Sequence, residues 1–235
     1  MSTHHHARTL VLAVALLAGV TPAGAQVALS GKAGTLGLGA ELTLGISPQT
    51  DGRLGVNAFS YSQRRAAGHN DYDATARLRT ATALLDWNPG AGSFHVTGGL
   101  VWNDNRVDGR SRPSAAGTYD IAGVQVPVSV VGRLDGRADF NQFAPYLGLG
   151  WGNPIQSPVT STRRLGAVFD AGVIFQGSPK VHLTPVIPAN SPILSIPGGR
   201  EALNILVQRE ERDLEDESSK YRYYPVVSLG VWYRF

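Results

Sequence analysis

Hydrophobic and polar residues alternate along most of the chain. From Leu36 to Ile46 every second residue is apolar, and the positions between them carry glycines, Thr43 and Glu41. Successive side chains of a β-strand point to opposite faces, so a period of two predicts a strand with one apolar face. The alternation recurs along the chain and predicts seven strands: 35–47, 53–62, 74–87, 94–105, 143–152, 165–176 and 225–235.

The two faces of these strands differ in a way that suits a membrane barrel. No internal run reaches the roughly 18 to 20 apolar residues of a transmembrane helix. Charged residues make up 17% of the chain, which contains 28 glycines, whereas soluble domains contain about 25% charged residues. A barrel places one face of each strand in lipid and the other in a lumen. We therefore predict an all-β fold, a closed antiparallel transmembrane β-barrel; a soluble β-sandwich is the alternative.

Three segments resemble bacterial outer-membrane proteins. They are Thr35-Leu-Gly-Leu-Gly, Ala144-Pro-Tyr-Leu-Gly-Leu-Gly-Trp-Gly152 and the last strand, Pro225 to Phe235. They resemble the small OmpA/OmpW-like barrels, which implies a location in the Gram-negative cell outer membrane. The resemblance also implies an assembly signal at Val231, Tyr233 and Phe235, read by the barrel-assembly machinery, and transit with periplasmic chaperones. We expect no peptidoglycan-binding domain, because the sequence ends with the barrel.

The resemblance sets the orientation of the strands. With Phe235 in the periplasm, the connections 63–73, 106–142 and 178–220 fall outside, and the turns 48–52 and 88–92 fall inside. Long outer loops and short inner turns are typical of these barrels, which have an even number of strands. An eighth strand must therefore precede residue 35, and Gln26 to Lys32 is the candidate.

The N-terminus has the features of a secretory signal peptide. Arg8 precedes an apolar stretch from Leu10 to Val20, and Ala23-Gly24-Ala25 forms a small-residue cleavage site. We predict a cleaved signal peptide at 1–25 and the barrel at 26–235. Cleavage changes the net charge from +3 to +2, since it removes Arg8, which gives no reason to expect nucleic acid as a partner. The chain has no cysteine, and we expect no cofactor or metal.

The long connections contain their own patterns. Residues 119–131 predict a hairpin that turns near Ala122-Gly123, and 200–219 predict a short amphipathic helix in the last extracellular loop. The segment between is rich in proline, which excludes a regular central strand. The acidic run 210–217 lacks the spacing of a calcium loop and suits a solvated helix face or a divalent-ion bridge to lipopolysaccharide. Basic residues of the predicted outer loops are candidates to contact lipopolysaccharide phosphates: Arg64, Arg65, Arg106, Arg110 and Arg112.

Charged residues predicted on the inner rows form the candidate site. An eight-stranded barrel is only wide enough to be filled by side chains, so we expect Glu41 and Asp170 to pair with Arg77 and Arg79 in a structural lumen network. An ion-selective pore is the alternative interpretation of these charges. His69, His95 and His182 with Ser60, Ser62 or Ser228 form no catalytic motif, so we predict no enzyme.

The pattern indicates location more than activity, because a fold alone does not specify function. We expect an outer-membrane barrel with a structural or surface-interaction role and a lumen plugged by side chains, in contact with membrane lipids and lipopolysaccharide. A narrow channel for small or apolar solutes is the alternative, and a lipid A-modifying enzyme is the third hypothesis.

Overall fold

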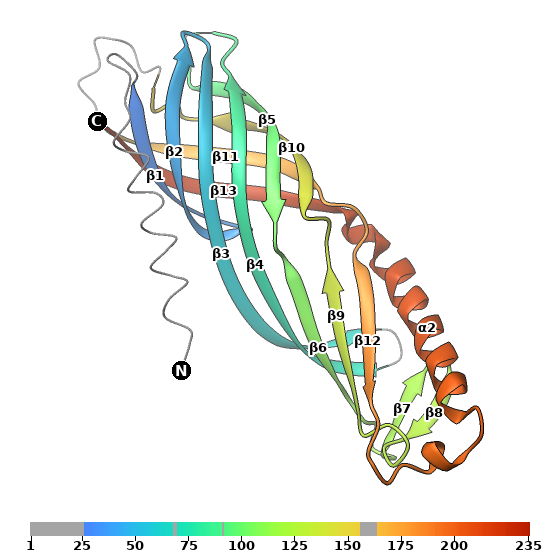
Figure 1. The fold of residues 1–235 in the computed structure, drawn as a ribbon. Coiled ribbons are helices and arrows are strands. Elements are labelled where there is room, and N and C mark those ends of the chain that lie inside the picture. Colours follow the sequence, from blue (N-terminus) through green and yellow to red (C-terminus); the bar gives the residue numbers. More distant parts are fainter. Residues whose placement is uncertain (1–25, 68–69, 91, 156–163) are drawn as a thin grey trace.

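Eight antiparallel strands close into a barrel (Figure 1), as the alternation predicts. The computed structural model describes residues 26–67, 70–90, 92–155 and 164–235, apart from the side chains of 63–67 and 70–72. The barrel strands, in order around the ring, are β1 (Val27–Gly34), β2 (Gly37–Ser47), β3 (Thr50–Ala67), β4 (Asn70–Trp87), β5 (Phe94–Asn103), β10 (Phe143–Trp151), β11 (Leu165–Phe175) and β13 (Tyr223–Arg234). The ring closes because β13 pairs with β1. The predicted eighth strand is confirmed and is β1.

The outer face of the barrel is an apolar belt with aromatic residues near both ends. Along β10 the side chains alternate strictly between exposed and buried positions, and its exposed positions include Leu147 and Leu149. Exposed aromatic residues occupy the periplasmic strand ends (Trp87, Phe94, Trp151 and Tyr233) and the opposite ends (Trp102, Phe143, Phe175 and Tyr223). Such a belt between two aromatic rings is the surface that a barrel presents to lipid.

Five of the eight barrel strands continue beyond the outer rim as a curved sheet (Figure 1). β3 and β4 run on without interruption. β5 is followed by β6 (Arg106–Arg112), β10 is preceded by β9 (Arg133–Asp139), and β11 is followed by β12 (Lys180–Val186). The register of β5 and β6 on β4 is the same, since Thr80 pairs with Asn103 and Arg77 with Arg106. The external sheet is therefore an extension of the barrel wall.

A helix and a hairpin cover the inner face of this extension. α2 (Gly199–Ser218) follows the short 3-10 helix η1 (Pro192–Ser195) and leads through η2 (Ser219–Arg222) into β13. The hairpin consists of β7 (Thr118–Ile121) and β8 (Val124–Pro127), and its predicted turn at Ala122-Gly123 is confirmed. Together they bury a second hydrophobic core that includes Ile121, Leu134, Leu183, Leu203 and Val207. No helix of the described chain is long and apolar enough to cross a membrane.

Acidic residues of α2 hold the helix on the edge of the external sheet. β12 is the edge strand, and its Val181 and Leu183 amides donate to Oε1 of Glu215 and Glu211, at 2.9 and 2.7 Å. Glu210, fully buried, accepts a 2.8 Å bond from the amide of Ala122. The predicted helix is confirmed, but these three carboxylates bind backbone amides rather than forming only a solvated face.

Two sequence predictions about the connections are corrected. Segment 63–73, predicted to be a loop, belongs to β3 and β4, which pair as far as Ala67 and Asn70. Above the membrane both sheet faces can be polar, so a polar composition does not separate strand from loop there. Segment 106–142 contains β6 and β9 in addition to the predicted hairpin. The proline-rich segment holds β12, an edge strand, where proline is tolerated. The predicted signal peptide lies outside the described residues.

Candidate functional site

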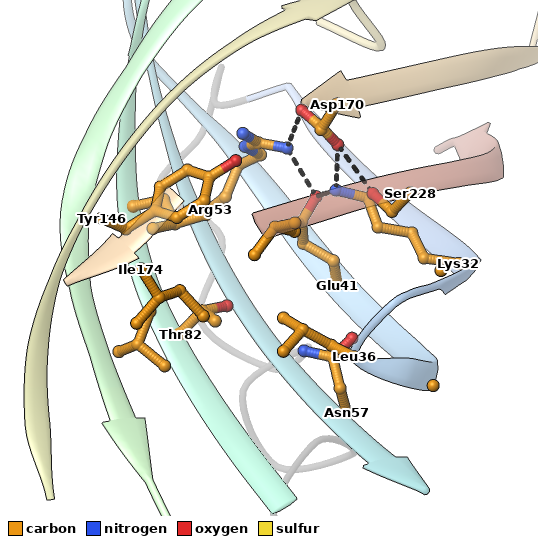
Figure 2. Close-up of a pocket in the computed structure, with 15 residues that line it drawn as sticks. Lys32, Leu36, Glu41, Arg53, Asn57, Thr82, Tyr146, Asp170, Ile174 and Ser228 are labelled. Carbon is orange, nitrogen blue, oxygen red and sulfur yellow. Dashed lines mark hydrogen bonds and ion pairs between the residues drawn. The ribbon is translucent and has the colours of Figure 1, made fainter. Parts of the chain in front are cut away.

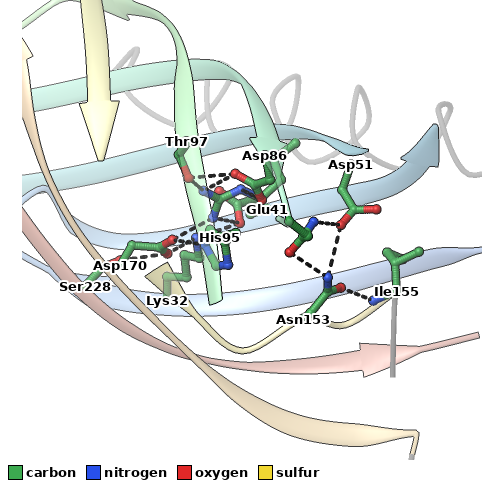
Figure 3. A network of polar contacts seen from close by, with 12 residues as sticks. Lys32, Glu41, Asp51, Asp86, His95, Thr97, Asn153, Ile155, Asp170 and Ser228 are labelled. Atoms are coloured by element: carbon green, nitrogen blue, oxygen red, sulfur yellow. Dashed lines mark hydrogen bonds and ion pairs between the residues drawn. The ribbon is translucent and has the colours of Figure 1, made fainter. Parts of the chain in front are cut away.

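The centre of the lumen is occupied by one arginine. Arg53 of β3 is 3% exposed, and its Nε lies 2.7 Å from Oδ2 of Asp86. Its Nη1 donates to Glu41 and Asp170, at 3.2 and 3.0 Å. Its Nη2 donates to Oδ1 of Asp86 and to Oγ1 of Thr97, both at 3.0 Å. The planar guanidinium thus joins carboxylates from three other strands across the lumen. Figure 2 shows Arg53 with Glu41 and Asp170, and Figure 3 shows Asp86 and Thr97 of the same layer.

A second cation and a histidine complete this layer. Nζ of Lys32 lies 2.6 Å from Glu41 and 2.7 Å from Asp170. His95 Nε2 lies 3.1 Å from Asp170 Oδ1, and Ser228 Oγ donates to Asp170 Oδ2 at 3.5 Å. Gly150 allows this packing, since a Cβ there would overlap the His95 ring. Ser228 and His95 both contact Asp170 rather than each other, which is not the nucleophile–base contact of a hydrolase.

A smaller polar cluster closes the periplasmic end. Asn88 Nδ2 and Asn153 Nδ2 both donate to Asp51 Oδ2, at 3.1 and 3.3 Å. Asn153 also donates to Asn88 Oδ1 at 3.0 Å and accepts the amide of Ile155 at 2.9 Å. All four residues are buried. The segment that follows β10 is therefore tied across the barrel mouth.

An apolar layer lies on the external side of the Arg53 layer. Its buried members are Leu36, Val101, Ala144, Tyr146, Ile174 and Val226. Between the two layers is a cavity of about 40 Å³ (Figure 2), and a buried water needs about 10–15 Å³ of such space. The cavity therefore has room for a few waters and no organic solute. Leu36, in the turn between β1 and β2, is one of its walls.

The turn that carries Leu36 is fastened to β13. The hydroxyl of Tyr224 donates to the carbonyl of Thr35 at 2.6 Å, and Thr35 Oγ1 donates to the carbonyl of Pro225 at 3.0 Å. At the outer rim, Asn103 Nδ2 donates to Gln176 Oε1 at 3.3 Å, and Gln176 Nε2 donates to the carbonyl of Tyr221 at 3.0 Å. Buried side chains thus form successive layers between the Asp51 cluster and the external core, with the cavity between the Arg53 layer and the apolar layer.

The external core also contains a buried phenol. Tyr119 of β7 is 3% exposed, and its hydroxyl donates to the carbonyl of Gly132 at 3.1 Å. Burial raises the pKa of Tyr119 above its usual range, so the phenol stays neutral and continues to donate at physiological pH.

The structure brings two of the four predicted lumen residues together and places the other two outside. Glu41 and Asp170 lie in the lumen, where their cations are Arg53 and Lys32. Arg77 and Arg79 are exposed and lie on the outer face of β4, near the rim. Arg77 pairs with Asp108 at 3.0 Å. Their predicted pairing with Glu41 and Asp170 is therefore wrong, because the inward row of β4 is formed by its even-numbered residues.

Three residues of the lumen layer were not predicted: Arg53, Asp86 and Lys32. The same alternation indicates that they point inward. With Leu54 and Val56 facing outward, Arg53 must face inward. Asp86 shares the inward row of Leu84, and Lys32 lies in the candidate eighth strand. The predicted assembly residues Val231, Tyr233 and Phe235 are exposed on the outer face, and the rings of the last two are in edge contact at 5.3 Å. Their role in assembly stays a prediction.

Among the described residues, no group of three or more histidine, aspartate or glutamate side chains is arranged to hold a metal ion. The closed ring and its apolar belt define a transmembrane β-barrel of the outer-membrane type, and the protein is located in an outer membrane.

Comparison with known proteins agrees with this class. No protein-family model and no curated protein matches the chain. Among solved structures, Acinetobacter baumannii CarO2 matches with a TM-score of 0.56 and 22% identity, over 89% of this chain and 98% of that chain. Acinetobacter baumannii CarO gives 0.54 and 21% over the same shares. A major outer membrane protein from Thermus thermophilus gives 0.45 and 16%, over 90% and 100%. At these identities the likeness to the two CarO proteins shows the fold; the OmpA/OmpW-like subfamily stays a prediction.

Proposed function

We propose that the protein is a non-conducting outer-membrane barrel that presents a rigid external domain at the cell surface. The observation that carries this proposal is the Arg53 layer, in which two cations and three carboxylates from five different strands meet in the lumen. Opening a path there would separate buried opposite charges, which costs several kcal/mol per ion. The apolar layer beyond it is a second barrier.

The external domain supports a role at the surface. Its sheet is continuous with the barrel wall, and its own core packs against α2 and the β7–β8 hairpin. Such a domain is held in a fixed orientation relative to the membrane, because β3 and β4 run through both parts. A fixed, exposed surface favours structural or interaction roles over transport.

The alternative is a narrow channel, and the cavity between the two layers is the observation that favours it. Its lining includes Lys32, Glu41 and Asp170, which offer both signs of charge to a small polar solute. Passage through this cavity would require Leu36 on one side and Arg53 on the other to move. The closed proposal and the channel therefore differ in whether these side chains stay in place.

Conductance of the refolded full chain in planar bilayers distinguishes the two. We expect no current steps from the wild-type protein and small, cation-selective steps from Arg53→Ser, since Glu41, Asp86 and Asp170 would then line a gap. Arg77→Ser, which removes the same side chain outside the lumen, is the matched control and should stay silent. Regular steps from the wild-type protein would overturn the closed-lumen proposal, whether or not the Arg53 variant folds. Steps that are lost when Leu36 is enlarged by Leu36→Trp would establish the channel.

A further inference from the structure

The outer face of the external sheet is polar, in contrast to the barrel face that it continues. The register aligns Arg77 of β4 with Arg106 of β6, Asp139 of β9 and Lys180 of β12 in one row across the sheet. The residues between these positions along β9 and β12, such as Ala138 and Val181, face the external core. The face of the sheet that turns away from α2 is therefore a charged surface. We call its first level above the barrel the rim row, which consists of Arg77, Arg106, Asp139 and Lys180.

The rim row lies at the height of lipid head groups. Trp102, an exposed residue of the outer aromatic ring, pairs with Ala81 of β4. Arg79 is two residues farther along β4 on the same face, roughly 7 Å along the strand, and Arg77 is two residues beyond it. Aromatic rings of membrane barrels mark the boundary of the hydrocarbon. Arg79 and Arg77 thus lie directly beyond this boundary, at the level where the phosphate groups of the lipids begin.

Cations exceed carboxylates at this height. The rim row and Arg79 together hold four cations and one carboxylate. Asp104 and Asp108 add two carboxylates, which leaves an excess of one positive charge. Arg106 pairs with Asp104 at 2.9 Å and Arg77 with Asp108 at 3.0 Å. Within the described part of the chain, no carboxylate lies within ion-pair distance of Arg79 or Lys180. The surface therefore carries positive charge that the protein itself does not neutralise.

The pairing of strands places two of these cations directly opposite each other. Arg77 and Arg106 are cross-strand partners, and side chains opposite each other are separated by only about 5 Å at Cβ. Like charges in this position destabilise a sheet. Asp108 and Asp104 each offset part of that repulsion by contacting one of the two guanidinium groups. An anion bound between the two groups would be an acceptor that both share, and arginine forks match the geometry of phosphate oxygens.

We propose that the rim row and Arg79 bind the phosphate groups of the phosphorylated glycolipid in the outer leaflet, with Arg77, Arg79 and Arg106 as the main contacts. The membrane-bound glycolipid is the occupant, rather than a soluble anion, because the site continues the lipid-facing surface of β4 and β5. The acyl chains of a glycolipid bound there would lie on the apolar belt below Trp102. This proposal goes beyond the closed lumen and does not depend on it.

Binding of purified bisphosphorylated lipid A to the refolded full chain in detergent, measured by native mass spectrometry, tests this site. We expect the triple variant Arg77→Ala, Arg79→Ala, Arg106→Ala to lower the affinity about tenfold or more. The matched control is Arg110→Ala, Arg112→Ala, Arg133→Ala, which removes the same charge farther out on the same sheet and should change affinity less than about threefold. Heat-modifiable gel mobility checks that both variants are folded.

Two further arms identify the occupant. Lipid A from which both phosphates have been removed should bind the wild-type protein as weakly as the intact lipid binds the triple variant. Inorganic phosphate at millimolar concentration should not displace the lipid, whereas efficient displacement would indicate a free-anion site. Equal lipid A affinity of the wild-type protein and the triple variant would overturn the proposal. A lipid-independent dimer that the triple variant abolishes would assign this face to a second copy of the chain and would also overturn it.

Discussion

Arg53 and Arg77 are the same residue type at opposite faces of the barrel wall, and their surroundings differ accordingly. The Arg53 side chain is 3% exposed and contacts Glu41, Asp86 and Asp170. The Arg77 side chain is 52% exposed and pairs with one carboxylate. In the lumen only the few waters that the adjoining cavity can hold could replace a lost partner, whereas at the surface bulk water can. The two arginines should therefore contribute very differently to stability.

Replacing Arg53 by methionine, which keeps an unbranched stem but removes the guanidinium group, should lower the free energy of unfolding by about 3–5 kcal/mol. The cause is the group of buried carboxylates left without their central cation. Urea-induced unfolding in lipid vesicles, followed by tryptophan fluorescence, measures the change. The matched control, Arg77→Met, should lower it by less than about 1 kcal/mol. If both variants lost the same amount, the Arg53 layer would not be a source of stability.

At the scale of single elements, α2 covers the exposed edge of β12. An edge strand exposes unpaired amides that can recruit another chain. Here the open-edge amides of Val181 and Leu183 are bound by Glu215 and Glu211, one helical turn apart on the same face of α2. The helix thereby protects the sheet edge and seals the external core at the same time.

Replacing Glu211 and Glu215 together by alanine should expose these two amides. An amide that loses its partner in a partly buried site loses about 1–2 kcal/mol of protection. Hydrogen exchange at Val181 and Leu183 should therefore become about five- to thirtyfold faster. Exchange measured by mass spectrometry on peptides that cover β12 gives the readout. Asp213→Ala, an exposed acidic position of the same helix, should leave these amides unchanged. Unchanged exchange in the double variant would contradict the capping role.

The alternation along the chain was sufficient for most elements and insufficient in the external sheet, where the inward rows contain few large apolar residues. It predicted the seven barrel strands, the hairpin at Ala122 and the helix, because each has an apolar face against a core or lipid. It did not predict β6 or β9, in which Arg106, Arg110, Arg133 and Arg137 alternate with few large apolar residues. Pairing between segments is what makes them strands: β6 pairs with β4, and β9 pairs with β6 and β12.

The sequence predicts that charged residues point into the lumen, but it does not predict which of them form ion pairs. Glu41 and Asp170 alternate with lipid-facing residues, so their inward direction follows from the period of two. Which cation reaches them depends on register between strands, and Lys32 reaches Asp170 across 138 positions of sequence. No local pattern specifies that distance. Arg53 was identifiable from the outward direction of its neighbour Leu54. Arg77 was assigned to the wrong face of β4, because the inward row of that strand contains Leu78 and Leu84, which the apolar pattern assigns to lipid.

At the scale of the whole molecule, the barrel and the external domain form one continuous wall. Five strands pass the rim, and the remaining three end there, where α2 takes the place of their continuation (Figure 1). This asymmetry means that only one side of the barrel carries the charged external sheet. We predict that the external sheet faces away from the periplasm, since the long connections belong to its end of the barrel and the turns at Pro48 and Pro89 to the other.

An epitope tag inserted at two exposed turns tests this orientation in intact cells. A tag between Ala115 and Ala116, in the exposed turn that joins β6 to β7, should bind antibody on intact cells. A tag between Pro89 and Gly90, in the turn between β4 and β5, should bind only after the outer membrane is permeabilised, because this turn lies with both chain ends of the barrel on the periplasmic side. Both insertions avoid buried residues and strand pairing, so the barrel should still assemble. The reverse labelling pattern would show that the external sheet faces the periplasm and would remove the basis for glycolipid binding at the rim row.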